Sequence, residues 1–223
     1  MTSTMTRTAI RLMLLAGLLA GLLAACAEPE NRSTGVYMLL DTSGTYTEEI
    51  EKAQQIVNFA LSRLDPGDSF ALARIDTASF SEKDIIARVT FDPRPSTANG
   101  QKRQFQTQLN EFVAGVRPSS HTDISGGLLQ ALEYLNEKSP GEKTIFIFSD
   151  LQEDLPEGYI RDFPMTFADV RVVALNVTKL RSDNVDPREY LNRLSDWQQR
   201  VERSGGHWQV INDLEALEKL FTG

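Results

Sequence analysis

The sequence predicts an α/β protein with a doubly wound, mostly parallel sheet of six strands that is flanked by helices. Two observations lead to this fold class. Short runs of apolar, β-prone residues alternate along the chain with longer segments in which apolar residues recur every three or four positions, a pattern typical of strands connected by amphipathic helices. The strand-like runs are also apolar almost throughout, as expected for strands that helices cover on both faces.

The elements follow one another without a repeat, a low-complexity tract or a second domain. Strands are predicted at residues 36–40, 69–75, 84–91, 143–148, 170–177 and 207–211. Helices are predicted at residues 47–64, 97–115, 124–138, 187–203 and 213–221. With 41% hydrophobic and 24% charged residues in a chain of 223, the composition fits one globular domain, which we place at residues 35–223.

Residues 1–25 are predicted to be a signal peptide and not part of the fold. Two arginines precede an uncharged apolar run at residues 12–25, which is shorter than the roughly 20 residues that a membrane-spanning helix needs. The run ends in LLAAC, which resembles the lipobox of bacterial lipoproteins and implies lipidation of Cys26, the only cysteine. A plain signal peptide cut nearby is the alternative. Residues 26–34 would then be the lipidated cysteine and a short polar tether.

The charge of the mature chain bears on its partners. Removing residues 1–25 removes two Arg and no acidic residue, which leaves 21 basic and 31 acidic residues and a net charge of −10. Such a surface lacks a nucleic-acid footprint and would be repelled by anionic lipid headgroups. We therefore expect the lipid anchor to hold the domain at the membrane, on the periplasmic side of the bacterial cell envelope. Ala27 favours the outer membrane over the inner one, by analogy with enterobacterial-type sorting.

Candidate ligands for a cation follow two of the predicted strands. Asp41 ends the first strand, and Ser43 and Thr45 alternate with other residues behind it, so one loop can direct several oxygens to a common point. Asp150 follows a later apolar strand, and Thr122 precedes a predicted helix. In doubly wound sheets, binding sites lie beyond the carboxyl ends of the strands. Carboxylate and hydroxyl oxygens there suit Mg²⁺ or Mn²⁺.

An aspartate at a strand end also suits a phosphate acceptor or an acid protease. A phosphatase-like site needs a second Asp two residues after Asp41, where Ser43 stands, and an aspartic protease needs two copies of Asp-Thr-Gly. No Gly-x-Ser-x-Gly elbow, phosphate-binding glycine loop or zinc-ligand cluster occurs. Asp183 and Asp186 lack the glycine and terminal Glu of a helix-loop-helix calcium site, so we interpret them as loop residues.

Together the three segments resemble the metal-ion-dependent adhesion site of von Willebrand factor type A (vWA) domains. That family has Asp-x-Ser-x-Ser after the first strand, a Thr in a middle loop and an Asp after a later central strand. The corresponding residues are Asp41, Ser43, Thr45, Thr122 and Asp150. The order of strands and helices also matches the family over almost the whole predicted domain. The resemblance implies a doubly wound fold with a bound divalent cation.

Three positions depart from the family pattern. Thr45 replaces a Ser and keeps the hydroxyl, whereas His121 and Leu151 stand where Gly is common and could alter the loops. We expect His121 at the rim of the site, and Asp123 at the start of the following helix, where the helix dipole favours a negative charge. The ordinary alternative for Thr122 is that it caps this helix. The acids at 153, 154 and 157 are interpreted as a solvated patch.

The sequence therefore predicts a non-enzymatic, lipid-anchored domain that binds protein through a divalent metal ion, as an adhesion or scaffold module. Octahedral coordination leaves a position for water, and the resemblance implies that an Asp or Glu of a protein partner takes that position. Two alternatives stay open. One is a metal-assisted phosphohydrolase that uses Asp41, and the other is a scaffold that binds through another face.

Overall fold

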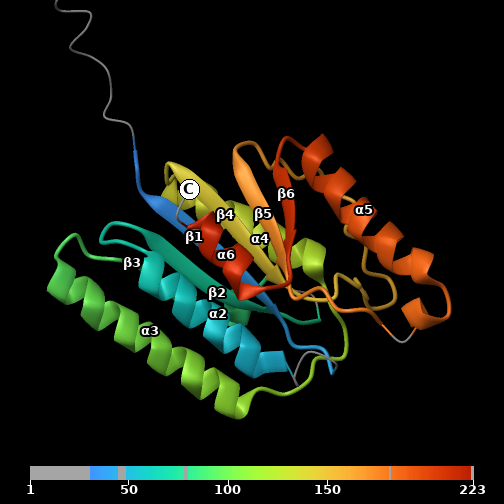
Figure 1. Cartoon of the computed structure of the whole chain (residues 1–223), viewed down its shortest axis with the longest axis horizontal. Coiled ribbons are helices and arrows are strands. Elements are labelled where there is room, and N and C mark those ends of the chain that lie inside the picture. Colours follow the sequence, from blue (N-terminus) through green and yellow to red (C-terminus); the bar gives the residue numbers. More distant parts are fainter. Residues whose placement is uncertain (1–30, 45–48, 78–79, 181, 222–223) are drawn as a thin grey trace, which may run out of the picture. The chain divides into compact units, whose positions relative to one another are not determined.

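The computed structural model describes most of the predicted domain (Figure 1). The described residues are 31–44, 49–77, 80–180 and 182–221. The predicted signal peptide, the lipidation site Cys26 and the candidate ligand Thr45 lie outside them.

The described residues form one six-stranded sheet, as predicted. Its strands are β1 (Thr34–Asp41), β2 (Ser69–Ile75), β3 (Ile85–Thr90), β4 (Glu142–Phe148), β5 (Val170–Leu175) and β6 (His207–Ile211). They lie in the order β3-β2-β1-β4-β5-β6, and every pair is parallel except β2 with β3. β5 ends two residues earlier than predicted because Asn176 adopts a left-handed conformation, with φ of 54°.

The helices cover both faces of the sheet (Figure 1). They are α2 (Ile50–Arg63), α3 (Pro95–Gly115), α4 (Ile124–Lys138), α5 (Pro187–Arg203) and α6 (Leu214–Leu220), with short 3₁₀ turns η3 (Glu82–Asp84) and η4 (Ser182–Asn184). α3 starts two residues before its predicted start, with Pro95 in its first turn, where a missing N–H does no harm. The predicted fold class is confirmed.

The central strand β1 shows why its sequence is apolar throughout. Successive side chains of a strand point to opposite faces, and here both faces are covered. Val36, Met38 and Leu40 belong to the core shared with α2, α3 and α6. Tyr37 and Leu39 belong to the core shared with α4 and α5. All five are 0% exposed, so β1 is anchored from both sides and its carboxyl end is fixed in space.

Close packing of α4 on β1 sets the position of the loop before α4. A Cβ atom at Gly127, in the first turn of α4, would lie 2.9 Å from Leu39 Cδ2. A larger residue would therefore displace Leu39 or push the helix away from the sheet. The glycine lets the start of α4, and with it residues 119–123, approach the carboxyl end of β1.

The connection between β4 and β5 differs from the other crossovers. Parallel neighbours usually need a helical crossover, but residues 149–169 contain no helix. Met165 and Phe167 bury their side chains in the core that contains α4 and α5, so the second half of this segment covers the sheet in place of a helix. The first half stays at the carboxyl edge of the sheet.

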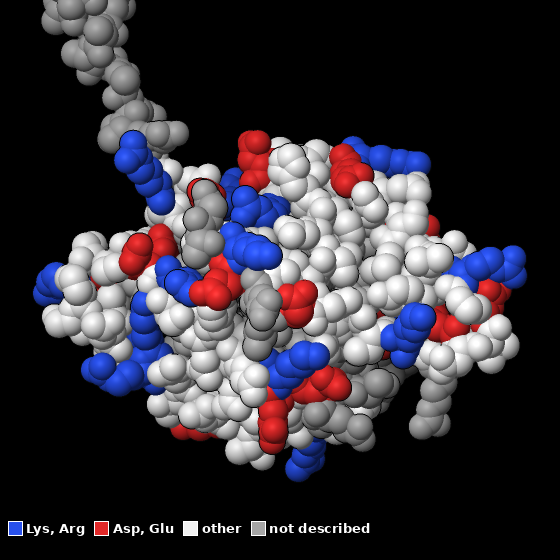
Figure 2. All heavy atoms as spheres, viewed as in Figure 1, with Lys and Arg blue, Asp and Glu red and all other residues white. Residues whose placement is uncertain are grey.

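The surface carries no continuous basic area on the face shown in Figure 2, where Lys and Arg are interspersed with Asp and Glu. Within the described ranges, no helix combines the length and the apolar character needed to cross a membrane.

Candidate metal centre

Asp41 is the last residue of β1, and it is fully buried. The Ser43 N–H donates to Oδ1 over 2.8 Å, and the Ser149 hydroxyl donates to Oδ2 over 2.6 Å. Burial raises the pKa of the Asp41 carboxyl, and the hydrogen bonds from Ser149 and Ser43 offset part of that rise. The surrounding chain thus fixes the orientation of a carboxylate whose charge is only partly compensated.

Asp150 lies two residues beyond β4, the strand that pairs with β1. Its Oδ1 accepts from the Gln152 N–H over 2.8 Å, and its carbonyl oxygen accepts from Arg193 Nε over 2.8 Å. Burial raises the pKa of Asp150 to about 6, with a further contribution from the Asp41 charge, while the Gln152 N–H and Arg193 act in the opposite direction. Two buried carboxylates therefore lie within electrostatic reach of each other at this edge.

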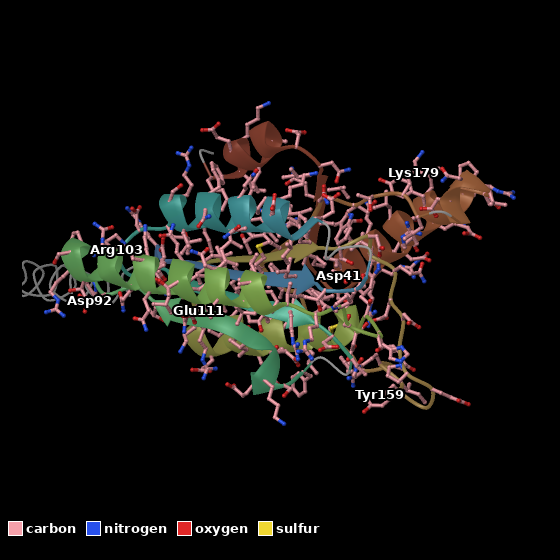
Figure 3. All side chains as sticks on the ribbon, turned by 90° about the horizontal axis from the view of Figure 1, so that it is seen from below. Asp41, Asp92, Arg103, Glu111, Tyr159 and Lys179 are labelled. Atoms are coloured by element: carbon pink, nitrogen blue, oxygen red, sulfur yellow. The ribbon has the colours of Figure 1, made fainter. Side chains whose placement is uncertain are left out.

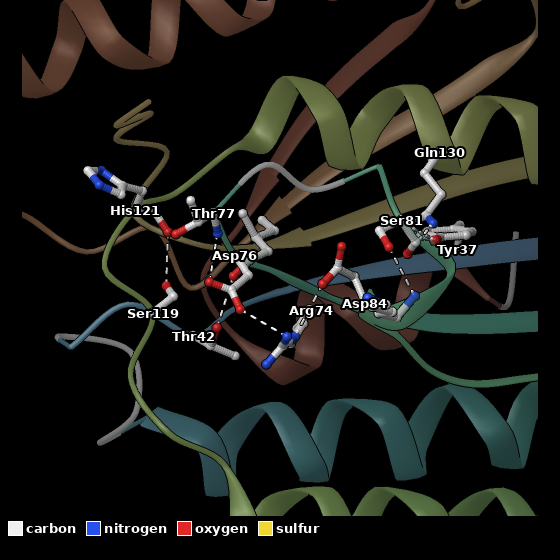
Figure 4. A network of polar contacts seen from close by, with 12 residues as sticks. Tyr37, Thr42, Arg74, Asp76, Thr77, Ser81, Asp84, Ser119, His121 and Gln130 are labelled. Atoms are coloured by element: carbon white, nitrogen blue, oxygen red, sulfur yellow. Dashed lines mark hydrogen bonds and ion pairs between the residues drawn. The ribbon is translucent and has the colours of Figure 1, made fainter. Parts of the chain in front are cut away.

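Backbone contacts join the end of β1 to the loop before α4. The Ser119 N–H donates to the Thr42 carbonyl oxygen over 2.8 Å, and Ser43 and Ser119 form an isolated parallel bridge. The Thr42 hydroxyl donates to the Ile75 carbonyl oxygen at the end of β2 over 2.9 Å. Figure 4 shows Thr42 and Ser119 close together at this corner of the molecule. The backbone of Ser43 is thus held by its hydrogen bond to Asp41 and by its bridge to Ser119.

The same loop is joined on its other side to the segment that follows Asp150. Thr122 and Asp154 form an antiparallel bridge in which the N–H of Thr122 donates over 2.8 Å and that of Asp154 donates back over 2.9 Å. His121 Nδ1 lies 3.1 Å from Asp154 Oδ2, so the imidazole faces this aspartate at the rim. Thr122 is buried, with 5% exposure. Three segments that are distant in the sequence are therefore held together at one edge.

The start of α4 corrects one alternative from the sequence. The N-cap of α4 is Asp123, whose Oδ1 accepts from the Gly126 N–H over 2.8 Å. The suggestion that Thr122 caps this helix is wrong, because the chain enters the helix one residue later. The expectation that Asp123 stabilises the helix start is confirmed. Its carboxylate also forms a salt bridge of 2.6 Å with Arg161, so its charge is compensated within the protein.

Four of the five predicted ligands thus lie on the three joined segments, and the fifth, Thr45, lies outside the described residues. The four are Asp41, Ser43, Thr122 and Asp150. Thr45 would follow Ser43 by two residues on the same loop.

Leu151 stands at a position where the sequence resemblance led us to expect glycine. It adopts a left-handed conformation, with φ of 66°, which glycine adopts without strain. The strain is of the order of 1 kcal/mol. The Leu151 side chain is buried, and its carbonyl oxygen accepts from Trp197 Nε1 over 3.0 Å. Packing and this hydrogen bond hold the conformation that a glycine would adopt freely.

One acid of the predicted solvated patch has a structural role instead. Glu153 is half-buried, and its Oε1 accepts from the Ser125 N–H in the first turn of α4 over 2.7 Å. For Glu153 the prediction is wrong, because a loop without a helix satisfies polar groups of neighbouring segments. Asp154 bridges to Thr122 through its backbone, but its side chain is exposed, as predicted. Glu157 is exposed, as predicted.

Sequence reasoning also missed three residues that support the site. Ser149, next to Asp150 in the sequence, could have been noticed from that position. Arg193 and Arg161 could not, because they lie 43 and 38 residues from Asp150 and Asp123, the residues they contact. Only the packing of α5 and of the irregular crossover brings them to the edge of the sheet.

The donors present fit a hard dication. Among the residues that the structure describes, no three or more His, Cys, Asp or Glu side chains gather into a metal-binding cluster. The donors are instead two carboxylates and neutral hydroxyls, which is the chemistry that Mg²⁺ and Mn²⁺ prefer and zinc does not. Two buried carboxylates with raised pKa values are also what a cation would stabilise, because its charge offsets both burial and their mutual repulsion.

Comparison with known proteins supports the fold. No protein-family model matches the sequence, and no curated protein sequence matches it. Among solved structures, a von Willebrand factor type A protein from Catenulispora acidiphila matches with a TM-score of 0.53 and 12% identity, over 86% of this chain and 41% of that one. The pilus adhesin SpaC from Lactobacillus rhamnosus GG, in its open conformation, matches with a TM-score of 0.54 and 12% identity, over 87% and 30%.

The chain spans less than half the length of either of these structures. At this level of identity the likeness concerns the fold. The chain has the fold of a vWA domain. Its six-stranded sheet with helices on both faces and its match to these two structures both support this assignment.

Proposed function

We propose that this protein is a membrane-anchored, protein-binding domain of the bacterial cell envelope that requires Mg²⁺ or Mn²⁺. One observation carries the proposal. Asp41 and Asp150 are buried at the ends of adjacent strands, both with raised pKa values, and neither has a salt bridge in the described part of the chain. Burying two acids in this way disfavours their ionised forms. A ligand of opposite charge would reverse that effect.

The residues would divide the work as follows. Asp41 and Asp150 would supply the negative charge, directly or through water. Ser43, Thr45 and Thr122 would supply neutral oxygens. When bound, the metal would offer a coordination position to a carboxylate from outside the chain. The chain itself fixes its ligands through backbone bridges and through the hydrogen bonds from Ser149 and Ser43 to Asp41.

A protein partner that contributes an Asp or Glu fits this arrangement best. Two protein carboxylates would balance the charge of a dication and leave a coordination position to water, and an anionic carboxylate oxygen binds a hard dication more strongly than that water does. The fold is also one that a pilus adhesin uses, which agrees with a role in binding proteins.

The two alternatives have less support. A phosphohydrolase would need Asp41 as a nucleophile or base, but both of its oxygens already accept hydrogen bonds, from Ser43 and Ser149. This arrangement suits a fixed ligand better than a reacting group. A scaffold that binds through another face would leave the two buried carboxylates without a purpose.

The test is metal-dependent capture of a partner. The mature protein is immobilised, exposed to envelope extract in Mg²⁺ or in chelator, and compared with Asp41→Ala and with Glu111→Gln, which removes an exposed acid from α3. We expect a protein that is retained in Mg²⁺ by the wild type and by Glu111→Gln, and lost in chelator and with Asp41→Ala. Retention that is unaffected by chelator and by Asp41→Ala would support the scaffold. Phosphatase activity that disappears with Asp41→Ala would support the enzyme.

The anchor is tested separately. Because the apolar run ends in LLAAC, Cys26→Ala should leave the precursor uncleaved or mislocalised. Membrane fractionation and the mass of the mature N-terminus measure this. Normal processing and membrane association of the variant would exclude the lipid anchor.

A further inference from the structure

Two consecutive apolar side chains are exposed on the irregular crossover that follows Asp150. Tyr159 is 47% exposed and Ile160 is 78% exposed. Large exposed apolar side chains are few among the described residues; the others are Phe80, Val185 and Leu191. Single exposed apolar residues are ordinary on protein surfaces, so exposure alone carries no conclusion. The contacts that hold Tyr159 and Ile160 at the surface are more informative.

Residues 156–160, here called the tip, are built on a closed turn. The Tyr159 N–H donates to the Pro156 carbonyl oxygen over 3.0 Å, and Gly158 has φ of 84°. A positive φ at the third residue of such a turn favours glycine, and proline is common near its start. The backbone of the tip is therefore shaped locally, without help from the side chains of Tyr159 and Ile160.

A buried ion pair then fixes the tip to the start of α4. Arg161 Nε lies 3.0 Å from each Asp123 oxygen, and Arg161 Nη2 lies 2.6 Å from Oδ2. Asp123 is 0% exposed and the Arg161 side chain 19%. The guanidinium carbon also lies 5.6 Å from the centre of the Tyr159 ring. Buried ion pairs contribute little net stability but can select one conformation, so we assign this pair the role of positioning the tip.

The tip lies at the same edge as the candidate metal centre. Asp123 follows Thr122 directly, and Asp154, two residues before the tip, bridges to Thr122. Figure 3 shows Asp41 and Tyr159 toward the same end of the molecule, whereas Arg103 and Asp92 lie toward the opposite end. A segment that reaches the metal with an acidic side chain would thus have the tip beside it.

We infer that the tip is a second contact surface for the protein partner, one that binds an apolar side chain placed close to the acidic residue that the metal takes. This inference rests on the proposed function. A turn whose backbone is already fixed by a hydrogen bond and anchored by an ion pair has less backbone freedom to lose on binding, so burial of Tyr159 and Ile160 contributes more of its free energy to affinity. Glu157, two residues before Tyr159, and Asp162, two residues after Ile160, are exposed and would repel a second acid. The preferred neighbour is therefore apolar and not acidic.

A phage-displayed library of random linear peptides tests the inference without a known partner. The purified full chain is immobilised in Mg²⁺, and bound phage are eluted with chelator. We expect the eluted peptides to share an Asp or Glu with an apolar residue at a fixed spacing. The same selection on Ile160→Ser should keep the acidic position and lose the preference for the apolar one.

Affinity of a single selected peptide gives the magnitude. We expect Ile160→Ser to bind it about tenfold more weakly, equivalent to about 1.4 kcal/mol, and Ile160→Leu, which keeps the apolar side chain, to bind it as the wild type does. Because Ile160 is 78% exposed, neither substitution should change the melting temperature or the affinity for Mn²⁺.

The other outcomes separate the inference from the proposed function. Peptides that share an acid without an apolar neighbour, or equal affinity for wild type and Ile160→Ser, would overturn the inference and leave the metal-dependent function intact. Peptides held through an apolar residue even in chelator would overturn the metal dependence and with it the shared site. Absence of any chelator-eluted peptide with an acid would overturn both.

Discussion

Two pairs of buried aspartates at the carboxyl edge of the sheet differ in how their charge is compensated. In the first pair, each carboxylate meets an arginine. Asp123 forms a salt bridge of 2.6 Å with Arg161, and Asp183 forms one of 2.8 Å with Arg193. The hydrogen bond from Arg193 lowers the pKa of Asp183. Both acids thus have a cationic partner within the protein, and both arginines tie a loop to a helix or a strand end.

In the second pair, no arginine or lysine takes this place in the described part of the chain. Asp41 accepts from a hydroxyl and a backbone N–H, and Asp150 from a backbone N–H. Burial raises the pKa of both carboxyls. Arg193 comes close to Asp150 but donates to its carbonyl oxygen and directs its other nitrogens to Asp183.

The difference indicates that the arginines at this edge pair with the acids that hold loops, Asp123 and Asp183. Asp41 and Asp150 keep their carboxylates available to a ligand. Had stability alone shaped this edge, a lysine or arginine beside Asp41 would have been the simpler solution. Four experiments test whether the two pairs differ in this way.

The largest effect is expected for Arg161→Gln, measured in chelator. The variant leaves the buried Asp123 without a charged partner, and breaking a buried pair in this way costs about 3 kcal/mol or more. Denaturant unfolding measures the loss. Adding Asp123→Asn should restore a large part of it, because no uncompensated charge is then buried. A double variant whose loss is the sum of both single losses would show that the two residues act independently.

Asp41→Asn should act on metal binding and not on folding. It removes one of two charges, so the affinity for Mn²⁺ should fall on the order of 100-fold, equivalent to about 2.7 kcal/mol. In chelator its free energy of unfolding should equal or exceed that of the wild type, because a buried charge is gone. Calorimetric titration and denaturant unfolding give the two numbers, with Glu157→Gln as the control. A large loss of stability in chelator would place Asp41 with the structural pair.

Thr122→Ala should weaken Mn²⁺ binding by about tenfold, roughly 1.4 kcal/mol, through the loss of one neutral oxygen. Asp123 and not Thr122 caps α4, so helix content and unfolding in chelator should change little. Circular dichroism and calorimetric titration distinguish the two effects. Unchanged metal affinity would remove Thr122 from the ligand set.

The fourth experiment varies the pH. The pKa of Asp150 is raised from 3.8 to about 6 in the folded chain, so between these values the unfolded chain ionises first. The free energy of unfolding in chelator should therefore fall, relative to Asp150→Asn, as pH rises from about 4 to about 6, and then level off. Mg²⁺ should reduce this difference above pH 6. A difference that grows in the opposite direction would mean that Asp150 is stabilised as an anion without metal.

The part of the candidate site that could be predicted from the sequence is the set of residues whose oxygens could bind a metal ion. Asp41, Ser43, Thr122 and Asp150 were predicted because oxygen-bearing residues follow apolar strands or precede a helix, and this pattern is local. Their meeting at one edge follows from parallel strands. The capping of α4 was less predictable, since Thr122 and Asp123 are both good caps and the choice depends on where the bridge to Asp154 holds the chain.

The order, type and nearly the full extent of the strands and helices could be predicted from the sequence, because burial on one or both faces imposes a periodicity that each segment carries alone. Which acids have a cationic partner depends instead on contacts between distant segments. Arg161 and Arg193 reach Asp123 and Asp183 from an irregular crossover and from α5, and no spacing encodes those contacts. Whether a buried carboxylate holds a loop or can hold a cation depends on charges brought near it by packing, and packing is a property of the whole chain.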